Sequence, residues 1–326
     1  MITTRQFGEV DGSPVTEAIL DSGVTKVSIL NYGCIFRDWQ VAGVPVVLGF
    51  DDLDDYLTDD WCFGILAGRV GNRIKKGCFS LNGQRYQLAI NDGPNHLHGG
   101  NVGLGKRLWQ MNVNGEVLRL SYHSPDGEES YPCDVDFEII IQLDGTKLTM
   151  DMQAKTNGYT PINLAQHNYY NLNGAGDVLN HELQVFANSF TETDAELIPT
   201  GRILPVQNTH RDFRKAVKIG LIDPDLIGLD DNLVLNVARD SHLPAATLRG
   251  DNSGLTLRLW TDQPGLQVFN APALDVEAKS GRKYKPFCGL AMEPQHFPDT
   301  VNHPEWAQIT CTPERPYVQK LVIDIA

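Results

Sequence analysis

Four short segments of this 326-residue sequence gather amide, histidine, carboxylate and glycine residues that could bind or transform a small polar molecule. These segments are 68–74, 91–100, 161–172 and 289–299. In the first, Asn72 and Arg73 can direct a fork of hydrogen-bond donors at a ligand, and the glycines allow close backbone approach. A solvated surface turn is the alternative. The segment lacks the Lys and Ser/Thr of a P-loop, so it gives no support for nucleotide phosphate binding.

The second segment contains two histidines, His96 and His98, separated by one residue. On a strand both rings would point to the same face, as in cupin-type metal sites. No carboxylate that could complete such a site follows in 99–105, and the flanking glycines favour a loop in which the rings need not converge. We therefore expect no metal ion here. One of the histidines is expected to contact the substrate, with a purely structural role as the alternative.

His167 in the third segment is surrounded by amides and aromatic residues rather than charges, which suits the wall of a site for a neutral polyol. Such surroundings would leave the ring near its ordinary pKa of about 6.5, where it can act as a general acid at physiological pH. Glu293 in the fourth segment follows an apolar, strand-like approach and precedes Pro294, which limits further ladder pairing. A carboxylate at a strand end, at the rim of a pocket, is well placed to act as a general base. Taken alone, each would more often be structural or solvent-exposed.

The elements that must position these residues have the periodicity of β-strands. Stretches that mostly alternate apolar with polar residues occur at 117–122, 137–141, 148–152, 255–259 and 321–325. Tight hairpin turns are signalled by Asn82-Gly83, Asn114-Gly115 and Asp144-Gly145. One short helix is expected around Arg211–Val217, and no helix recurs between strands as in a parallel α/β fold. We predict an all-β fold: a large antiparallel β-sandwich with very little helix, forming a single domain over 1–326, with the C-terminal strand pairing into the main sheet.

The composition disfavours several classes of partner. Lys and Arg total 27 and Asp and Glu total 41, so the formal net charge of −14 repels nucleic acids and anionic membrane surfaces. No apolar stretch reaches the ~18–20 residues of a membrane span, and the N-terminus lacks the pattern of a secretory signal. Six scattered cysteines without a C-x-x-C pair are expected to be free thiols. We therefore expect a cytoplasmic protein that binds neither nucleic acid nor membrane.

Together the four segments resemble the aldose 1-epimerase (galactose mutarotase) family. They match its motifs in order: G-R-x-x-N-R-I, N-x-L-H-G-G, N-L-x-x-H-x-Y-x-N-L and E-x-Q-x-F-P-D. The resemblance continues in 197–205 and 212–214 and extends from Asn31 to the last strand. It implies the galactose-mutarotase-like supersandwich fold. It also implies interconversion of the α and β anomers of a free aldose such as glucose or galactose, without a cofactor or metal and with the small-molecule aldose as partner.

Carried over to the matching positions, the resemblance makes Glu293 the general base and His167 the general acid. Substrate-binding roles fall on Asn72, Arg73, His98, Asp230 and Gln267. Asp231 stands where the family commonly has His or Asn, so a second carboxylate is expected beside Asp230, which leaves the preferred sugar open. The oligomeric state, monomer or homodimer, is open as well.

Three other functions remain possible from the residues. A glycoside hydrolase could use Asp230 and Glu293 as its carboxylate pair, although His167 would then have no role. A hexose-phosphate 1-epimerase needs a phosphate clamp, and the dense basic cluster at 282–285 is better explained as a solvated loop. A non-catalytic sugar-binding module could use the same cleft. Accelerated mutarotation of a fresh sugar anomer would separate the epimerase from the hydrolase and the binding module.

Overall fold

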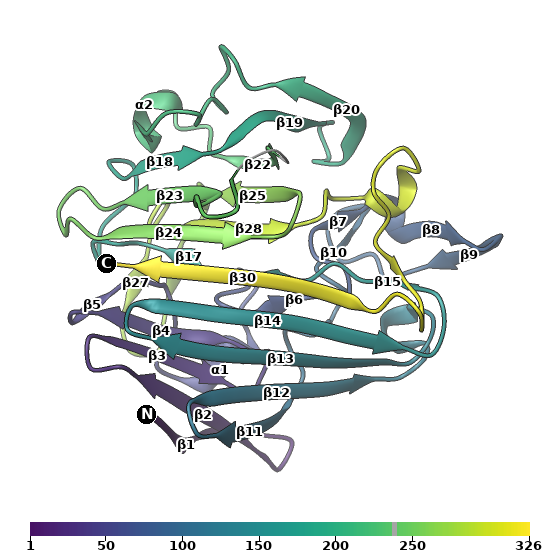
Figure 1. The fold of residues 1–326 in the computed structure, drawn as a ribbon, viewed down its shortest axis with the longest axis horizontal. Coiled ribbons are helices and arrows are strands. Elements are labelled where there is room, and N and C mark those ends of the chain that lie inside the picture. The colour runs from purple at the N-terminus through teal and green to yellow at the C-terminus, as the bar shows by residue number, and fades with distance from the viewer. Residues whose placement is uncertain (237–239) are drawn as a thin grey trace.

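A computed structural model of the chain describes residues 1–236 and 240–326. Three large antiparallel sheets account for most of its strands (Figure 1). The first is a five-stranded sheet of the N-terminal region in the order β1 (Ile2–Val10), β2 (Ser13–Asp21), β3 (Thr25–Leu30), β4 (Phe36–Val41) and β5 (Val44–Pro45). Its order follows the chain, so it is a simple meander.

The second sheet is nine-stranded, and its strand order joins the middle of the chain to its end. The order is β11 (Gln110–Asn114), β12 (Val117–Ser124), β13 (Val135–Asp144), β14 (Lys147–Thr156), β30 (Tyr317–Ile325), β24 (Thr256–Thr261), β23 (Ala246–Arg249), β18 (Glu182–Val185) and β21 (Val217–Lys218). The C-terminal strand β30 therefore lies between β14 and β24, which confirms the expected closing strand. The five alternating stretches expected to be strands all fall in this sheet.

The third sheet is six-stranded and carries the residues of greatest chemical interest. Its order is β17 (Tyr169–Tyr170), β28 (Leu290–Gln295), β25 (Gly265–Phe269), β22 (Asp230–Leu235), β19 (Ala187–Thr193) and β20 (Pro199–Pro205). A backbone bridge between Val47 and Tyr170 connects this sheet to the end of the five-stranded sheet. The two sheets thus continue one another.

Smaller strand pairs connect the large sheets. They are β6 (Leu66–Ala67) with β16 (Ala165–Gln166), β7 (Arg73–Ile74) with β10 (His96–Leu97), β8 (Cys78–Leu81) with β9 (Gln84–Gln87), β15 (Thr160–Pro161) with β29 (Thr310–Cys311), and β26 (Val276–Glu277) with β27 (Lys283–Tyr284). Two short α-helices, α1 (Leu53–Leu57) and α2 (Ile219–Ile222), are found in the described residues, with 3₁₀ turns at Lys75–Gly77, Glu128–Ser130 and Thr300–Asn302.

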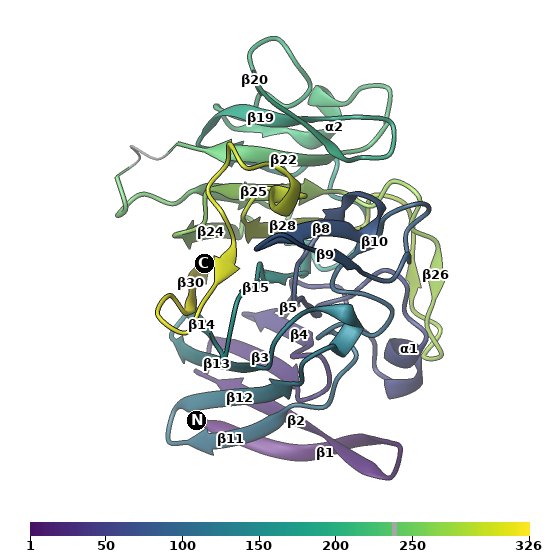
Figure 2. The same cartoon turned by 90° about the vertical axis from the view of Figure 1, so that its right-hand side faces the viewer.

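The apolar core lies between the nine-stranded sheet and the layer formed by the other two (Figure 2). Leu120, Ile139 and Met150 of the nine-stranded sheet belong to the same buried cluster as Trp39 of β4 and Val268 of β25. Burial of alternate residues on facing strands is the pattern of a β-sandwich. The all-β sandwich prediction is therefore confirmed. The three predicted turns also join consecutive strands, as expected: Asn82-Gly83 lies between β8 and β9, and Asn114 and Asp144 end β11 and β13 with their glycines in the turns.

The prediction of a helix around Arg211–Val217 is wrong. In the structure, the Phe213 carbonyl accepts a hydrogen bond from the Val185 amide of β18 (2.8 Å), and the Phe213 side chain is buried. An isolated helix this short is not stable by itself, so pairing with a strand edge and burial of Phe213 decide the conformation. The six cysteines are free thiols, as expected. No helix among the described residues is long and apolar enough to span a membrane.

Candidate active site

A cavity of about 170 Å³ lies on the face of the six-stranded sheet that is turned away from the core. On β25, Leu266 and Val268 point into the core, whereas Gln267 and Phe269 line the cavity, because successive side chains of a strand alternate between faces. The cavity is lined by Asp60, Trp61, Cys62, Asn72, Arg73, Leu97, His98, His167, Tyr169, Asp230, Gln267, Phe269 and Glu293. All seven residues expected from the sequence to form the site are among them.

The register of three neighbouring strands brings distant residues together at this cavity. Gln267 on β25 is paired with Glu293 on β28, and Phe269 is paired with Asp230 on β22. Paired residues share a face of the sheet, as do residues two apart on one strand. These four side chains must therefore point to one side. Tyr169, paired with Ala291 on β28, joins them for the same reason.

Asp231 does not place a second carboxylate in the cavity, so that expectation is wrong. It follows Asp230 on β22 and therefore points to the opposite face of the sheet. There its carboxylate is buried and accepts a hydrogen bond from Arg211, whose guanidinium also stacks over the Phe190 ring at 4.4 Å. Asp231 is thus part of an ion pair on the opposite face of the sheet, from where its charge still contributes to the raised pKa of Asp230.

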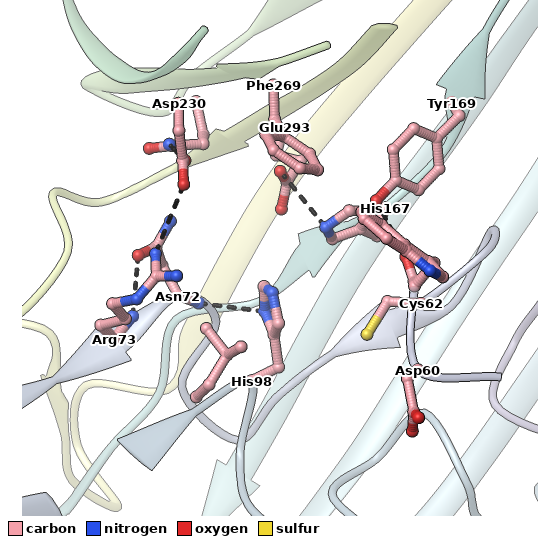
Figure 3. Close-up of a pocket in the computed structure, with 13 residues that line it drawn as sticks. Asp60, Cys62, Asn72, Arg73, His98, His167, Tyr169, Asp230, Phe269 and Glu293 are labelled. Carbon is pink, nitrogen blue, oxygen red and sulfur yellow. Dashed lines mark hydrogen bonds and ion pairs between the residues drawn. The ribbon is translucent and has the colours of Figure 1, made fainter. Parts of the chain in front are cut away.

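Glu293 and His167 face one another in the cavity (Figure 3). Oε1 of Glu293 lies 3.6 Å from Nε2 of His167, and both residues are buried, with 1% and 5% of their surfaces exposed. His167 lies between β16 and β17, where its amide donates to the Ile65 carbonyl and its carbonyl accepts from Gly64. Glu293 is inside β28, which continues through Pro294 to Gln295. The prediction that Glu293 stands at a strand end on the rim of the pocket is therefore wrong. All five residues of β25 pair with β28, and this pairing continues past Glu293.

The burial of this pair changes its titration. Removal from water raises the pKa of Glu293 to about 8, with the nearby Asp230 carboxylate adding to the effect. Burial lowers the pKa of His167 to about 4. The expectation that His167 keeps its ordinary pKa is therefore wrong: neutral neighbours do not stabilise an imidazolium that has lost its water.

His98 is held as a neutral hydrogen-bond donor. Its Nδ1 accepts a hydrogen bond from the backbone N–H of Asn72 (3.2 Å), so the ring proton must reside on Nε2. Burial lowers the pKa of His98 well below its ordinary value, with His167 and Arg73 adding to the effect. Its neighbour Gly99 has φ +90°, and a Cβ there would lie 1.7 Å from the Gly68 carbonyl oxygen. The turn that presents His98 therefore requires glycine.

His96 lies outside the cavity. It is fully buried, and its Nδ1 and Nε2 lie 2.8 Å from the Ala89 carbonyl and the Tyr131 hydroxyl. The two rings do not converge, as the loop interpretation anticipated. Among the described residues, no group of three or more His, Cys, Asp or Glu side chains is arranged to hold a metal ion.

A chain of polar contacts crosses the side of the cavity opposite His167. Nε2 of Gln267 donates to Oδ1 of Asp230 (2.5 Å), and Nη1 of Arg73 lies 3.6 Å from Oδ2 of Asp230. Burial raises the pKa of Asp230, while the Arg73 charge opposes that change. Oε1 of Gln267 has no hydrogen-bond partner among the described residues. Acceptors and donors suited to vicinal hydroxyl groups therefore face the cavity.

The sequence indicated aromatic residues around His167 as part of the wall but did not name Tyr169, and it did not single out Phe269. Phe269 and Tyr169 lie two residues from Gln267 and His167, so period-2 spacing could have indicated them. The segment Asp60–Cys62 carried no such signal, because it is a loop positioned by tertiary contacts. Tyr169 donates its hydroxyl proton to the Trp61 carbonyl (2.9 Å), which fixes this loop against the sheet.

Comparison with known proteins connects this geometry to a family. The sequence profile described as "Aldose 1-epimerase" matches residues 18–324. The chain belongs to the aldose 1-epimerase family. It is 38% identical to the galactose mutarotase of Bos taurus, over 97% of this chain and 96% of that protein. It is 33% identical to the aldose 1-epimerase of Haemophilus influenzae, over 94% of each.

Solved structures of the aldose 1-epimerase family agree. A GalM/aldose epimerase homologue from C. elegans superimposes with a TM-score of 0.90 at 27% identity, covering 95% of this chain and 99% of that one. A galactose 1-epimerase from Lactobacillus acidophilus gives 0.87 at 24% identity, covering 100% and 98%, and supports the fold. These matches confirm the resemblance seen in the sequence, the mutarotase-like fold and an isomerase activity of the mutarotase type.

Proposed function

We propose that this protein interconverts the α and β anomers of a free, neutral aldose such as glucose or galactose, with Glu293 and His167 as its proton-transfer pair. The observation that carries the proposal is the 3.6 Å approach of the Glu293 carboxylate to the His167 imidazole inside a buried polar cavity. A carboxylic acid and an imidazole at this spacing can exchange protons with two oxygens of one bound ring.

In the proposed reaction Glu293 removes the proton of the anomeric hydroxyl while His167 donates a proton to the ring oxygen. The bond between the anomeric carbon and the ring oxygen breaks, and the open-chain aldehyde forms. Rotation about the adjacent carbon–carbon bond presents the other face of the carbonyl. The same transfers in reverse then close the ring, so protons and electrons balance with no net redox change.

The remaining polar residues are proposed to hold the sugar through these steps. Arg73, His98 and Asn72 provide donors or fix them, and Asp230 with Gln267 provides acceptors. Binding the hydroxyls away from the reacting carbon keeps the open chain in place between ring opening and ring closure. Tyr169 and Phe269 offer flat apolar faces to the carbon–hydrogen side of the sugar.

The two rival enzyme classes fit these contacts less well. The cations at 282–285 are the candidates for the phosphate clamp of a sugar-phosphate enzyme, but they are already paired with Asp51, Glu277 and Asp275 and do not line the cavity. A hydrolase built on Asp230 and Glu293 would leave unexplained why His167 faces Glu293. We further propose that the chain acts as one unit in the cytoplasm, with no metal or cofactor and no nucleic-acid or membrane partner, consistent with its net charge of −14.

Polarimetry tests the proposal. Freshly dissolved α-D-glucose or α-D-galactose should reach its equilibrium rotation faster with the protein than with the Glu293→Gln variant at equal concentration. Exhaustive chelation should leave the rate unchanged. Binding of a sugar without acceleration would make the protein a binding module, and hydrolysis of an aryl glycoside without mutarotation would make it a glycosidase.

A further inference from the structure

Arg73 is shared between two carboxylates, of which only one lines the cavity. Its Nε lies 2.7 Å from Oδ2 of Asp92, and its Nη1 lies 3.6 Å from Oδ2 of Asp230. The Asp92 side chain is one-third exposed and does not line the cavity. The shorter contact of Arg73 is therefore made to a residue outside the wall of the cavity (Figure 3 shows Arg73 and Asp230).

Asp92 is presented by a rigid turn. Its amide and carbonyl both bond to the backbone of Asn95, at 3.1 and 2.8 Å. The side chain of its neighbour Asn91 bonds to both the amide (2.8 Å) and the carbonyl (3.0 Å) of Leu97. Leu97 is paired with Arg73 across β10 and β7. The carboxylate and the guanidinium are thus held by one short, cross-linked piece of backbone.

This contact also sets the charge that a ligand meets. A free guanidinium is a good receptor for a carboxylate or phosphate group, because its planar fork binds two oxygens at once. Here Nε is occupied by Asp92, and the cavity wall adds the carboxyl groups of Asp60 and Asp230. The charge of Asp92 acts on a residue of the cavity wall, because it contributes to the raised pKa of Asp230.

We propose that Asp92 is a positioning and specificity-determining residue: it orients the Arg73 guanidinium toward the sugar and neutralises it, so that the site accepts neutral aldoses and rejects anionic ones such as uronic acids and sugar phosphates. This inference rests on the proposed function. It assigns to Asp92 two separable effects, one through the hydrogen bond to Nε and one through the negative charge.

Three substitutions separate the two effects. Asp92→Ala removes both, so KM for galactose should rise about tenfold while kcat changes less than about twofold, because Glu293 and His167 are untouched. Asp92→Asn keeps an acceptor for Nε and loses the charge. Its KM for galactose should therefore change little, while D-galacturonate should bind about tenfold more tightly by calorimetry. Asp92→Glu, which restores a carboxylate, should recover much of the loss in Asp92→Ala.

Asp60→Asn is the matched comparison, since it removes one negative charge from the cavity wall at a residue with no ion pair to Arg73 among the described residues. It should strengthen galacturonate binding less than about threefold. An equal gain in galacturonate affinity in Asp92→Asn and Asp60→Asn would overturn the proposal, because it would show a general effect of negative charge. A fall in kcat with unchanged KM in Asp92→Ala would also overturn it. Absence of mutarotation in the unsubstituted protein would instead refute the proposed function, while the calorimetric comparison would still test Asp92.

Discussion

The Glu293 carboxylate and the His167 imidazole lie 3.6 Å apart, and each has one polar atom, Oε2 and Nδ1, with no hydrogen-bond partner among the described residues. Because burial brings the pKa of Glu293 to about 8 and that of His167 to about 4, the pair holds a single proton between these values. A pair with one proton contains one acid and one base. Between these pH values the proton rests on Glu293, so it must pass to His167 before Glu293 can remove the anomeric proton, and ring opening proceeds from the form of the pair in which His167 carries the proton.

The first prediction is the pH dependence of kcat/KM, which reports the free enzyme. As the pH falls through about 4 the pair gains a second proton and loses its base, and as the pH rises through about 8 it loses its only proton and its acid. Activity should therefore be level between these limits and fall on both sides. The measurement is the enzyme-dependent mutarotation rate across the pH range, after subtraction of the buffer-catalysed rate.

An alkaline limb near pH 6.5, the ordinary pKa of histidine, would contradict this prediction. It would mean that the imidazolium is stabilised by something other than its neutral surroundings. The two limits belong to the pair and not to either residue alone, since the groups are close enough to titrate together.

The second prediction concerns the rate of the chemical step. Glu293→Gln keeps the size of the side chain and removes the proton transfer, so kcat should fall by on the order of 10²–10⁴ while the sugar still binds. His167→Ala should cause a comparable loss. The double variant should be worse than either by less than the product of the two effects, because the residues act as a unit.

Asp230→Asn is the contrasting variant. It removes a hydroxyl acceptor and an ion-pair partner of Arg73 but no proton-transfer group, so it should act mainly on KM. A nearly normal kcat in His167→Ala together with an inactive Asp230→Asn would contradict the proposed mechanism and indicate a hydrolase with two catalytic carboxylates.

Local sequence pattern predicted the parts of this structure that local physics determines. The alternation around 137–141 and 148–152 predicted strands because a half-buried sheet imposes period 2, and the glycine turns predicted their hairpins. The grouping of Glu293 with His167 came from the family resemblance, because residues this far apart share no local signal. Register then explains why Asp230 enters the site and Asp231 does not.

The failures have a common physical origin in tertiary burial. The segment around Phe213 is irregular and not helical, because its backbone bonds to the Val185 amide of β18 and its side chain is buried. The pKa values of Glu293 and His167 depend on how completely the surrounding strands exclude water, which composition around each residue does not reveal. Asp92 was missed because its role depends on its contact with Arg73, which lies 19 residues away in the sequence.

The third prediction distinguishes the two histidines. His98→Ala removes the Nε2–H donor from the cavity, so KM should rise about tenfold with little change in kcat. His96→Ala should leave KM unchanged but lower the free energy of unfolding by about 1–3 kcal/mol, because it leaves the buried Tyr131 hydroxyl without its partner. Steady-state kinetics and urea unfolding of both variants are the measurements. A larger rise in KM for His96→Ala would mean that the turn presents the other ring to the sugar.

The last prediction is a gain of stability on loss of the base. The pKa of Glu293 is raised in the folded state from 4.5 to about 8, so folding favours its neutral form, and stability is lost as the pH rises between those values. Glutamine does not titrate. Glu293→Gln should therefore be more stable than the unsubstituted protein at pH 8 by roughly 1–3 kcal/mol, with the difference shrinking toward zero near pH 4.5. Urea unfolding at the two pH values measures this difference in stability.

Glu9→Gln removes an exposed carboxylate on β1 and is the control, and its stability difference should show no such dependence on pH. A difference that does not change with pH would mean that folding does not shift the pKa of Glu293, and a difference that falls as the pH rises would mean that the cavity stabilises its charged form.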